Sequence, residues 1–115
     1  MTKQMNIGIF GSNNDSTIDG VVAEAAQAER DGFASYWQSQ IFGLDALSTL
    51  SVVGREVPRI ELGTSVIPVY PRHPMMLAQQ ALTANQAAGG RLTLGIGLGH
   101  KVVVEGMTGM SFDKP

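Results

Sequence analysis

The chain has 115 residues, a formal net charge of −2, 43% hydrophobic residues and no cysteine. This length and composition are typical of one globular domain and exclude a disordered chain. The absence of cysteine excludes disulfides and thiolate metal sites, and the weak negative charge argues against a nucleic-acid partner. No apolar run is long enough to span a membrane and no signal peptide precedes the first strand, so we expect a cytoplasmic protein without a membrane partner.

Four strands and three helices are predicted to alternate along the chain. Runs of apolar and β-branched residues predict strands over 5–10, 33–38, 60–69 and 91–96. Apolar stripes at helical spacing predict helices over 17–30 and 46–57. Proline at the start and Gly89-Gly90 at the end predict a third helix over 74–88. Ser16 and Asp19 have the spacing of a capping box, Asp45 can cap the second helix, and Pro74 can occupy the first position of the third. The Gly-rich tail, 97–115, receives no assignment.

The spacing of the predicted strands indicates a parallel sheet. Successive strands begin near Asn6, Phe33, Ile60 and Arg91, so their starts are 27, 27 and 31 residues apart. Strand–helix units of this size predict right-handed crossovers between parallel strands. Two architectures of the α/β class fit this pattern, a doubly wound open sheet and part of a (β/α)₈ barrel, which needs eight such units.

Glycines lie within the third predicted strand and at the end of the fourth. Gly63 interrupts the third strand, which predicts a bulge or a close approach of another part of the backbone. The run Gly95-Ile96-Gly97-Leu98-Gly99 invites comparison with a dinucleotide-binding fingerprint, but its spacing is G-x-G-x-G rather than G-x-G-x-x-G. A small open-sheet nucleotide-binding module therefore stays open only as an alternative.

Several segments of the chain resemble one known family. The runs LGTSVIPVYPRHPMMLAQQALT, GGRLTLGIGLGHKVVVEGM, YWQSQIFGLDAL and SFDKP are similar to those of luciferase-like monooxygenases. Within that family the chain is most similar to the actinobacterial oxidoreductases that use coenzyme F420, a deazaflavin. The resemblance implies a partial (β/α)₈ TIM barrel of the luciferase type, with about four parallel strands. Residues 1–115 would then be the N-terminal half of the barrel domain.

The resemblance also implies a cofactor site at the carboxyl ends of the strands. The cofactor would be coenzyme F420, or alternatively FMN, and the reaction a hydride transfer to or from a small organic substrate. Relatives carry a non-prolyl cis peptide in the third strand, which matches Ser65–Val66. The positions that match cofactor-binding residues are Gly63, Thr64, Ser65, Val66, Gly97, Leu98 and Gly99. The positions that match the substrate side are Ser39, Gln40 and Ile41.

The chain departs from the sugar-phosphate dehydrogenases of this superfamily. Their Asp-His pair after the second strand matches Gln40-Ile41 here, and their acid at the end of the fourth strand matches His100. That substrate class is therefore not expected. His100 is the candidate catalytic residue, because a histidine titrates near neutral pH and can donate a proton. The alternative is a partly exposed loop histidine.

Other polar residues give weaker signals. Arg72 and His73 precede a predicted helix, where they could bind an anion or, more simply, cap the helix. His73 and His100 are the two histidines of the chain, and no carboxylate cluster accompanies them, so no metal site is expected.

A half-barrel would leave its first and fourth strands with open edges. Such edges pair with other strands, so we expect a homodimer or a missing C-terminal half-barrel as partner. Barrel enzymes often hold phosphate with loops after strands seven and eight. We therefore expect the isolated chain to bind the cofactor weakly and to show little activity. A non-catalytic half-barrel that only dimerises is the further alternative.

Overall fold

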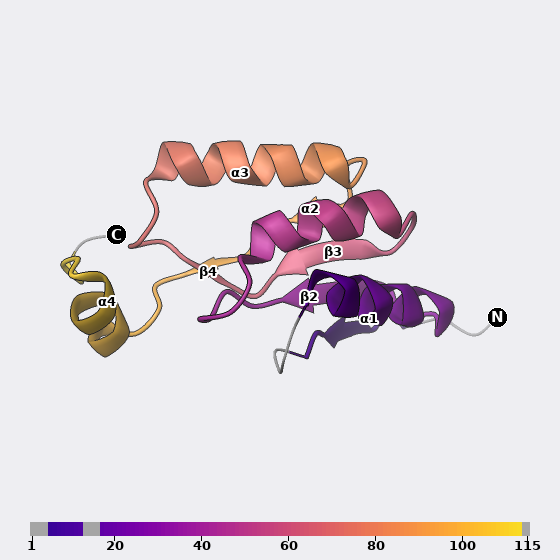
Figure 1. Ribbon diagram of the computed structural model, residues 1–115, viewed down its shortest axis with the longest axis horizontal. Helices are drawn as coiled ribbons and strands as arrows, with labels where there is room; N and C mark the ends of the chain where they lie inside the picture. Colours follow the sequence, from indigo (N-terminus) through magenta and orange to yellow (C-terminus); the bar gives the residue numbers. More distant parts are fainter. Residues whose placement is uncertain (1–4, 13–16, 114–115) are drawn as a thin grey trace.

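The computed structural model describes residues 5–12 and 17–113, and in these ranges the predicted strands and helices follow in the predicted order, with two strands divided and a further helix, α4, added. The strands are β1 (Gly8–Phe10), β2 (Ser35–Gln38), β3 (Glu61–Thr64), β4 (Ile67–Pro68), β5 (Leu92–Thr93) and β6 (Ile96–Gly97). The helices are α1 (Ile18–Arg30), α2 (Ala46–Glu56), α3 (Pro74–Ala87) and α4 (Lys101–Thr108). The carboxyl ends of the strands point towards α4, on the left of Figure 1.

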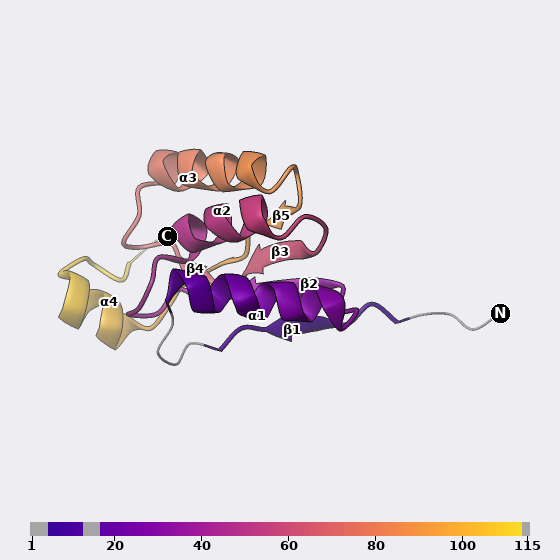
Figure 2. The ribbon, with the colours of Figure 1, turned by 45° about the vertical axis from the view of Figure 1, so that its right-hand side comes forward.

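The main sheet is parallel, and its strands lie side by side in chain order, β1-β2-β3-β5. Figures 1 and 2 show α1, α2 and α3 lying side by side over the same face of this sheet. A doubly wound sheet reverses its strand order and places helices on both faces. The open-sheet alternative is therefore wrong, and the architecture is that of a partial (β/α)₈ barrel.

The hydrophobic core lies between the sheet and the three helices. One residue from each strand of the main sheet faces the helices at the same level: Ile9, Tyr36, Leu62 and Leu92, which the parallel register aligns. They pack against buried side chains of α1 and α2: Val21, Ala25, Leu50 and Val53. Burial of each large aliphatic side chain stabilises the fold by about 1.5–3 kcal/mol, so this layer is the main source of stability.

The core contains one polar chain, which joins α1 to β2. The Tyr36 hydroxyl donates to Glu24 Oε1 at 2.6 Å and accepts from Gln38 Nε2 at 2.7 Å. Burial of the phenol raises the pKa of Tyr36 well above its usual range, and the bond to Glu24 raises the pKa further. The phenol therefore stays protonated and acts as a donor. Gln38 is buried on the helix-covered side and serves this network.

The opposite face of the sheet carries the ring of Trp37, which two glycines leave room for. The indole of Trp37 donates from Nε1 to Ser35 Oγ at 2.8 Å, which fixes the orientation of the ring. A Cβ atom on Gly63 would lie 2.3 Å from this ring, and one on Gly8 would lie 2.9 Å from its nitrogen. Gly63 thus permits a close approach, but the prediction that backbone would approach is wrong, because the neighbour is the side chain of Trp37.

The helix caps agree with the predictions to within a residue or two. Asp45 caps α2, since its carboxylate accepts from the Ser48 N–H at 2.9 Å, and Pro74 is the first residue of α3. α1 begins one residue later than predicted, because Thr17 is its cap and accepts from the Gly20 N–H. The predicted cap Ser16 lies outside the described residues.

Two predicted strands are wrong as continuous strands. The third is divided into β3 and β4, and the fourth into β5 and β6. The second halves, β4 and β6, pair with each other and form a separate two-stranded parallel sheet. The physical reason is a bulge: the register runs from Gly63↔Thr93 to Ile67↔Ile96, so the third strand spends one residue more than the fourth. The first two strands begin later than predicted, β1 at Gly8 instead of residue 5 and β2 at Ser35 instead of residue 33.

Arg91 ties the amino ends of the strands to the helices. Its guanidinium donates to three backbone carbonyls, those of Ala88 at 2.6 Å, Ile60 at 2.7 Å and Gly54 at 2.8 Å. These carbonyls belong to the end of α3, the entry to β3 and the last turn of α2. One side chain thus holds three elements together at the end of the sheet remote from α4.

Candidate functional site

The predicted site lies where the bulge interrupts the third strand, at the carboxyl ends of the parallel strands. The peptide bond Ser65–Val66 is cis, as the resemblance predicted. The Ser65 N–H donates to the Gln38 carbonyl at 2.7 Å, and the Ile67 N–H donates to the Gly95 carbonyl at 2.9 Å. The bulge is therefore held on both sides, by the second strand and by the fourth.

An exposed, uncharged surface lies beside the bulge. We call Val66, Gly97, Leu98 and Gly99 the strand-end surface. Val66 is 39% exposed and Leu98 is 50% exposed. A Cβ atom on Gly97 would lie 2.7 Å from Val66 Cγ2, so the valine side chain rests directly on the glycine. Gly99 has φ +76, a left-handed conformation that favours glycine.

Not every predicted cofactor-binding residue faces this surface. The space beside Gly63 is filled by the ring of Trp37, and Thr64 is buried with its hydroxyl bonded to Gly95. Strand alternation could have shown that Gly63 and Thr64 face opposite sides of the sheet. Thr64 is aligned with Gln38, and both are buried on the helix-covered side. The structure brings Val66 and Gly97 into contact and leaves Gly63 beneath Trp37.

The loop after β2 reaches the bulge through Gln40. Its backbone N–H donates to the Val66 carbonyl at 3.4 Å, which places the predicted substrate-side residues Ser39, Gln40 and Ile41 next to the bulge. The Gln40 side-chain oxygen accepts from the Ala46 N–H at 2.8 Å and so supports the start of α2. Ile41 is 52% exposed. Phe42 was not predicted, yet it is 69% exposed in the same loop.

An ion pair that sequence reasoning missed joins two loops at this end of the molecule. Arg72, after β4, pairs with Asp45, the cap of α2, and donates to Gln80 of α3 at 2.8 Å. Burial alone would raise the pKa of Asp45, but hydrogen bonds from Ser48 and Arg72 outweigh it and hold the pKa below its usual value. For His73 the capping interpretation is confirmed, because Nδ1 accepts from the Met75 N–H at 3.1 Å.

His100 lies at the start of α4, directly after the strand-end surface. Its carbonyl accepts from the Val104 N–H at 2.9 Å, while its side chain is exposed and makes no capping hydrogen bond. α4 itself was not predicted. After α4 the chain returns to the exit of β4, where Phe112 stacks on Tyr70 with ring centroids 4.6 Å apart.

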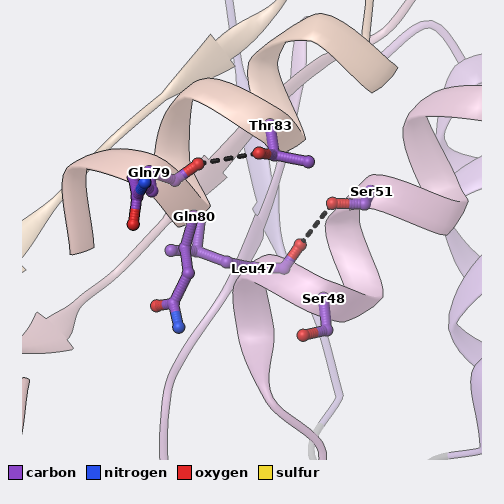
Figure 3. A pocket seen from close by; sticks show the side chains of 6 residues that line it. All are labelled: Leu47, Ser48, Ser51, Gln79, Gln80 and Thr83. Carbon is purple, nitrogen blue, oxygen red and sulfur yellow. Dashed lines mark hydrogen bonds between the residues drawn. The ribbon is translucent and has the colours of Figure 1, made fainter. Parts of the chain in front are cut away.

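Two surface grooves lie elsewhere. A groove of about 210 Å³ between α2 and α3 is lined by Leu47, Ser48, Ser51, Gln79, Gln80 and Thr83. Figure 3 shows that the hydroxyls of Ser51 and Thr83 donate to carbonyls of their own helices, at 2.9 Å and 2.8 Å. The second groove, of about 390 Å³, is largely apolar and lies between α3, the segment after β4 and the start of β6; it is lined by Val69, Arg72, Pro74, Leu77, Ala78, Leu94 and Ile96.

The described residues were also searched for other kinds of site. In 5–12 and 17–113, His, Asp and Glu side chains form no group of three that could hold a metal ion. Among the helices of this part of the chain, none is both long and apolar enough to cross a membrane.

Comparisons with known proteins agree on one family. The model of the family described as luciferase-like monooxygenase matches residues 5–115. A Mycobacterium tuberculosis protein that carries the name coenzyme F420-dependent oxidoreductase is 36% identical over 111 residues, which are 96% of this chain and 31% of the relative. The chain therefore spans about a third of the length of that relative.

Solved structures share the fold. An F420-dependent secondary alcohol dehydrogenase in complex with an F420–acetone adduct matches with a TM-score of 0.80 and 22% identity, over 98% of this chain and 36% of that one. The oxygenating constituent of 3,6-diketocamphane monooxygenase from Pseudomonas putida, in complex with FMN, matches with a TM-score of 0.81 and 20% identity, over 94% of this chain and 33% of that one.

Proposed function

Because the chain belongs to the luciferase-like monooxygenase family, we propose that it forms the cofactor-facing part of an oxidoreductase that uses coenzyme F420 or FMN. The observation that carries the proposal is the strand-end surface, an uncharged patch at the carboxyl ends of parallel strands. Barrel enzymes place their active sites at that end. On this proposal, residues 1–115 are the N-terminal half of a (β/α)₈ domain.

The strand-end surface has the properties that a planar ring needs. Val66 and Leu98 offer exposed apolar contact. The absence of a side chain at Gly97 leaves room for Val66 to lie on the fourth strand, so the valine itself presents a surface to a ring. We propose that Ser65, Val66, Gly97, Leu98 and Gly99 hold the ring. The other two candidates are Gly63 and Thr64. We propose that Gly63 contributes only by leaving room for the Trp37 ring, which fills the space beside it.

When bound, a deazaflavin or flavin supplies the chemistry of hydride transfer, and the protein supplies orientation and exclusion of water. We propose that Ser39, Gln40 and Ile41 line the substrate side, since Gln40 is bonded to the Val66 carbonyl. His100 is the proposed proton donor, because its exposed imidazole follows Gly99 directly and is not used as a cap. The substrate class is a small organic molecule.

Ligand titration tests the cofactor assignment, with coenzyme F420 and FMN as separate probes. Trp37 is the single tryptophan of the chain and lies on the face of the sheet opposite the helices, so its emission reports binding. We expect saturable quenching by at least one probe. Because the chain spans 31% of its relative, we expect millimolar rather than micromolar affinity for the 115 residues alone. Absence of saturation by both probes would contradict the proposal.

The role of His100 has its own test, in an active protein that contains this chain. His100→Gln should lower kcat by about a hundredfold and leave cofactor affinity within about threefold, because only proton transfer is lost. His73→Gln is the matched control, since His73 caps α3, and its kcat should stay near that of the wild type. An unchanged kcat in His100→Gln would make His100 merely the residue that precedes α4.

We also propose that both edges of the sheet pair with further strands, from a second copy or from a C-terminal half-barrel. Apolar side chains are exposed along β1, where Ile7 and Phe10 are 53% and 54% exposed, and at the other edge, where Ile96 is 55% exposed. Open, apolar parallel edges promote association. Light scattering of the 115-residue chain should show a dimer or larger species, and a stable monomer at high concentration would contradict this.

A further inference from the structure

We infer that Thr64 is a positioning residue, whose buried hydroxyl sets the spacing between the two backbone segments that form the strand-end surface. One segment is the bulge after β3, and the other is the part of the fourth strand around Gly95. The inference rests on the proposed function, because it assigns Thr64 a role in cofactor binding that involves no contact with the cofactor.

The Thr64 hydroxyl is bonded twice to a single residue. Its Oγ1 atom accepts from the Gly95 N–H at 2.8 Å and donates to the Gly95 carbonyl at 2.9 Å. Thr64 is 1% exposed, so water does not compete for these bonds. The same Gly95 carbonyl also accepts from the Ile67 N–H at 2.9 Å. Gly95 is thus fastened to both sides of the cis peptide.

The register explains why a side chain is needed here. Ladder pairing stops at Gly63↔Thr93 and resumes at Ile67↔Ile96, so Gly95 lies opposite the bulge. A bulge leaves part of the ladder without its regular hydrogen bonds, and backbone groups away from water need a partner. The Thr64 hydroxyl provides both a donor and an acceptor at this point, in place of a backbone group.

This contact also controls the distance between the two segments. A Cβ atom on Gly95 would lie only 2.1 Å from the Thr64 carbonyl oxygen, so the two backbones touch. Two residues further along each strand, Val66 rests on Gly97, where a Cβ would lie 2.7 Å from Val66 Cγ2. A change at Thr64 and Gly95 therefore shifts Val66 relative to Gly97.

Thr64 does not itself face the strand-end surface. It is aligned with Gln38, which is bonded to Tyr36 in the core between sheet and helices. The acceptor and the donor of its hydroxyl are both engaged with Gly95. The geometry is that of a group that acts on a ligand through the backbone it holds.

The test compares three variants of the chain. Thr64→Val removes the hydroxyl at nearly constant volume, and Thr64→Ser keeps it. Thr49→Val is the matched control, because Thr49 is 2% exposed and its hydroxyl donates to the Asp45 carbonyl at 2.8 Å, within α2. Three quantities are measured: hydrogen exchange of the Gly95 amide without ligand, affinity for coenzyme F420, and the melting temperature.

We expect Thr64→Val to accelerate exchange of the Gly95 amide and to weaken F420 binding, each by about tenfold, as loss of a buried hydrogen bond predicts. Thr64→Ser should stay within about threefold of the wild type in both. Thr49→Val should leave Gly95 exchange and F420 affinity unchanged, although its melting temperature should fall about as far as that of Thr64→Val. If the role of Thr64 were merely structural, Thr64→Val and Thr49→Val would lose stability alike and would bind F420 with equal affinity.

Each contrary result identifies what has failed. Faster Gly95 exchange with F420 affinity equal to that of Thr49→Val would overturn the positioning role and leave the proposed function standing. Unchanged Gly95 exchange in Thr64→Val would show that the hydroxyl does not hold the fourth strand, and would overturn the inference at its first step. If the wild type binds neither F420 nor FMN, the proposed function is refuted, and with it the role of Thr64 towards a cofactor. If it binds FMN alone, the same comparison of affinities is made with FMN.

Discussion

The two ends of the parallel sheet are built differently. At the amino ends, Arg91 donates to three carbonyls from three elements, and Glu29 accepts from the N–H groups of Arg59 and Ile60. At the carboxyl ends, backbone segments approach closely at glycines beside the Thr64 hydroxyl and the Arg72–Asp45 pair, and apolar side chains such as Val66 stay exposed. The amino end is therefore built for stability, and the exposed carboxyl end is the one to which we assign the proposed ligand surface.

The largest expected effect tests the amino end. Arg91→Ala should lower the free energy of unfolding by about 3 kcal/mol, because it removes three charge-assisted hydrogen bonds to backbone carbonyls. Arg59→Ala is the matched control at the same end, since that side chain is 80% exposed, and it should cost less than about 1 kcal/mol. Denaturant unfolding measures both. Equal losses would mean that Arg91 does not join the three elements.

A smaller effect is expected where the sheet carries Trp37. Gly63→Ala should cost about 1–3 kcal/mol, because the new methyl group would lie 2.3 Å from the indole and the ring must move. The shift of tryptophan emission reports that movement. Gly43→Ala, where a Cβ would meet nothing within 4 Å, is the control.

A double variant sharpens this test. In Gly63→Ala combined with Trp37→Val, the cost of the added methyl group should largely disappear, since no ring occupies the space. Additive losses in such a cycle would show that the two residues are not in contact.

The smallest effect concerns the ion pair between the two loops. The lowered pKa of Asp45 means that its contribution to stability is present above the unfolded pKa of about 4 and is lost as the pH falls through the folded value. Asp45→Asn should therefore cost less than about 1 kcal/mol at neutral pH, and nothing at strongly acidic pH. Thermal unfolding between neutral and acidic pH measures this. Arg72→Gln should show the same trend, and a loss independent of pH would contradict it.

The helices and their caps could be predicted because their signals are local. Asp45 before an apolar stripe, Pro74 at a helix start and Gly89-Gly90 after a helix each act through their own neighbours in the chain. The parallel sheet followed from the regular spacing of the units, whereas the barrel architecture, and with it the strand order, came only from the resemblance. α4 was missed because it is short and begins at His100 without a side-chain cap.

The site was less accessible to sequence reasoning. The cis bond at Ser65–Val66 came from resemblance alone, and the division of the third and fourth strands depends on hydrogen bonds across 31 residues, between Thr64 and Gly95. The role of Gly63 required knowledge of where the ring of Trp37 lies. Such contacts are decided by tertiary packing, which no local pattern in the chain specifies.

The chain order of the sheet has a consequence for synthesis on the ribosome. β2 pairs with β1, β3 with β2, and β5 with β3, so each strand of the main sheet finds its partner in the strand translated shortly before it. Domains that begin to fold during translation benefit from such local pairing, because β2, β3 and β5 each meet a partner strand that is already present. A slow codon or a mutation within one crossover would therefore delay the later strands and leave the pairs already formed undisturbed.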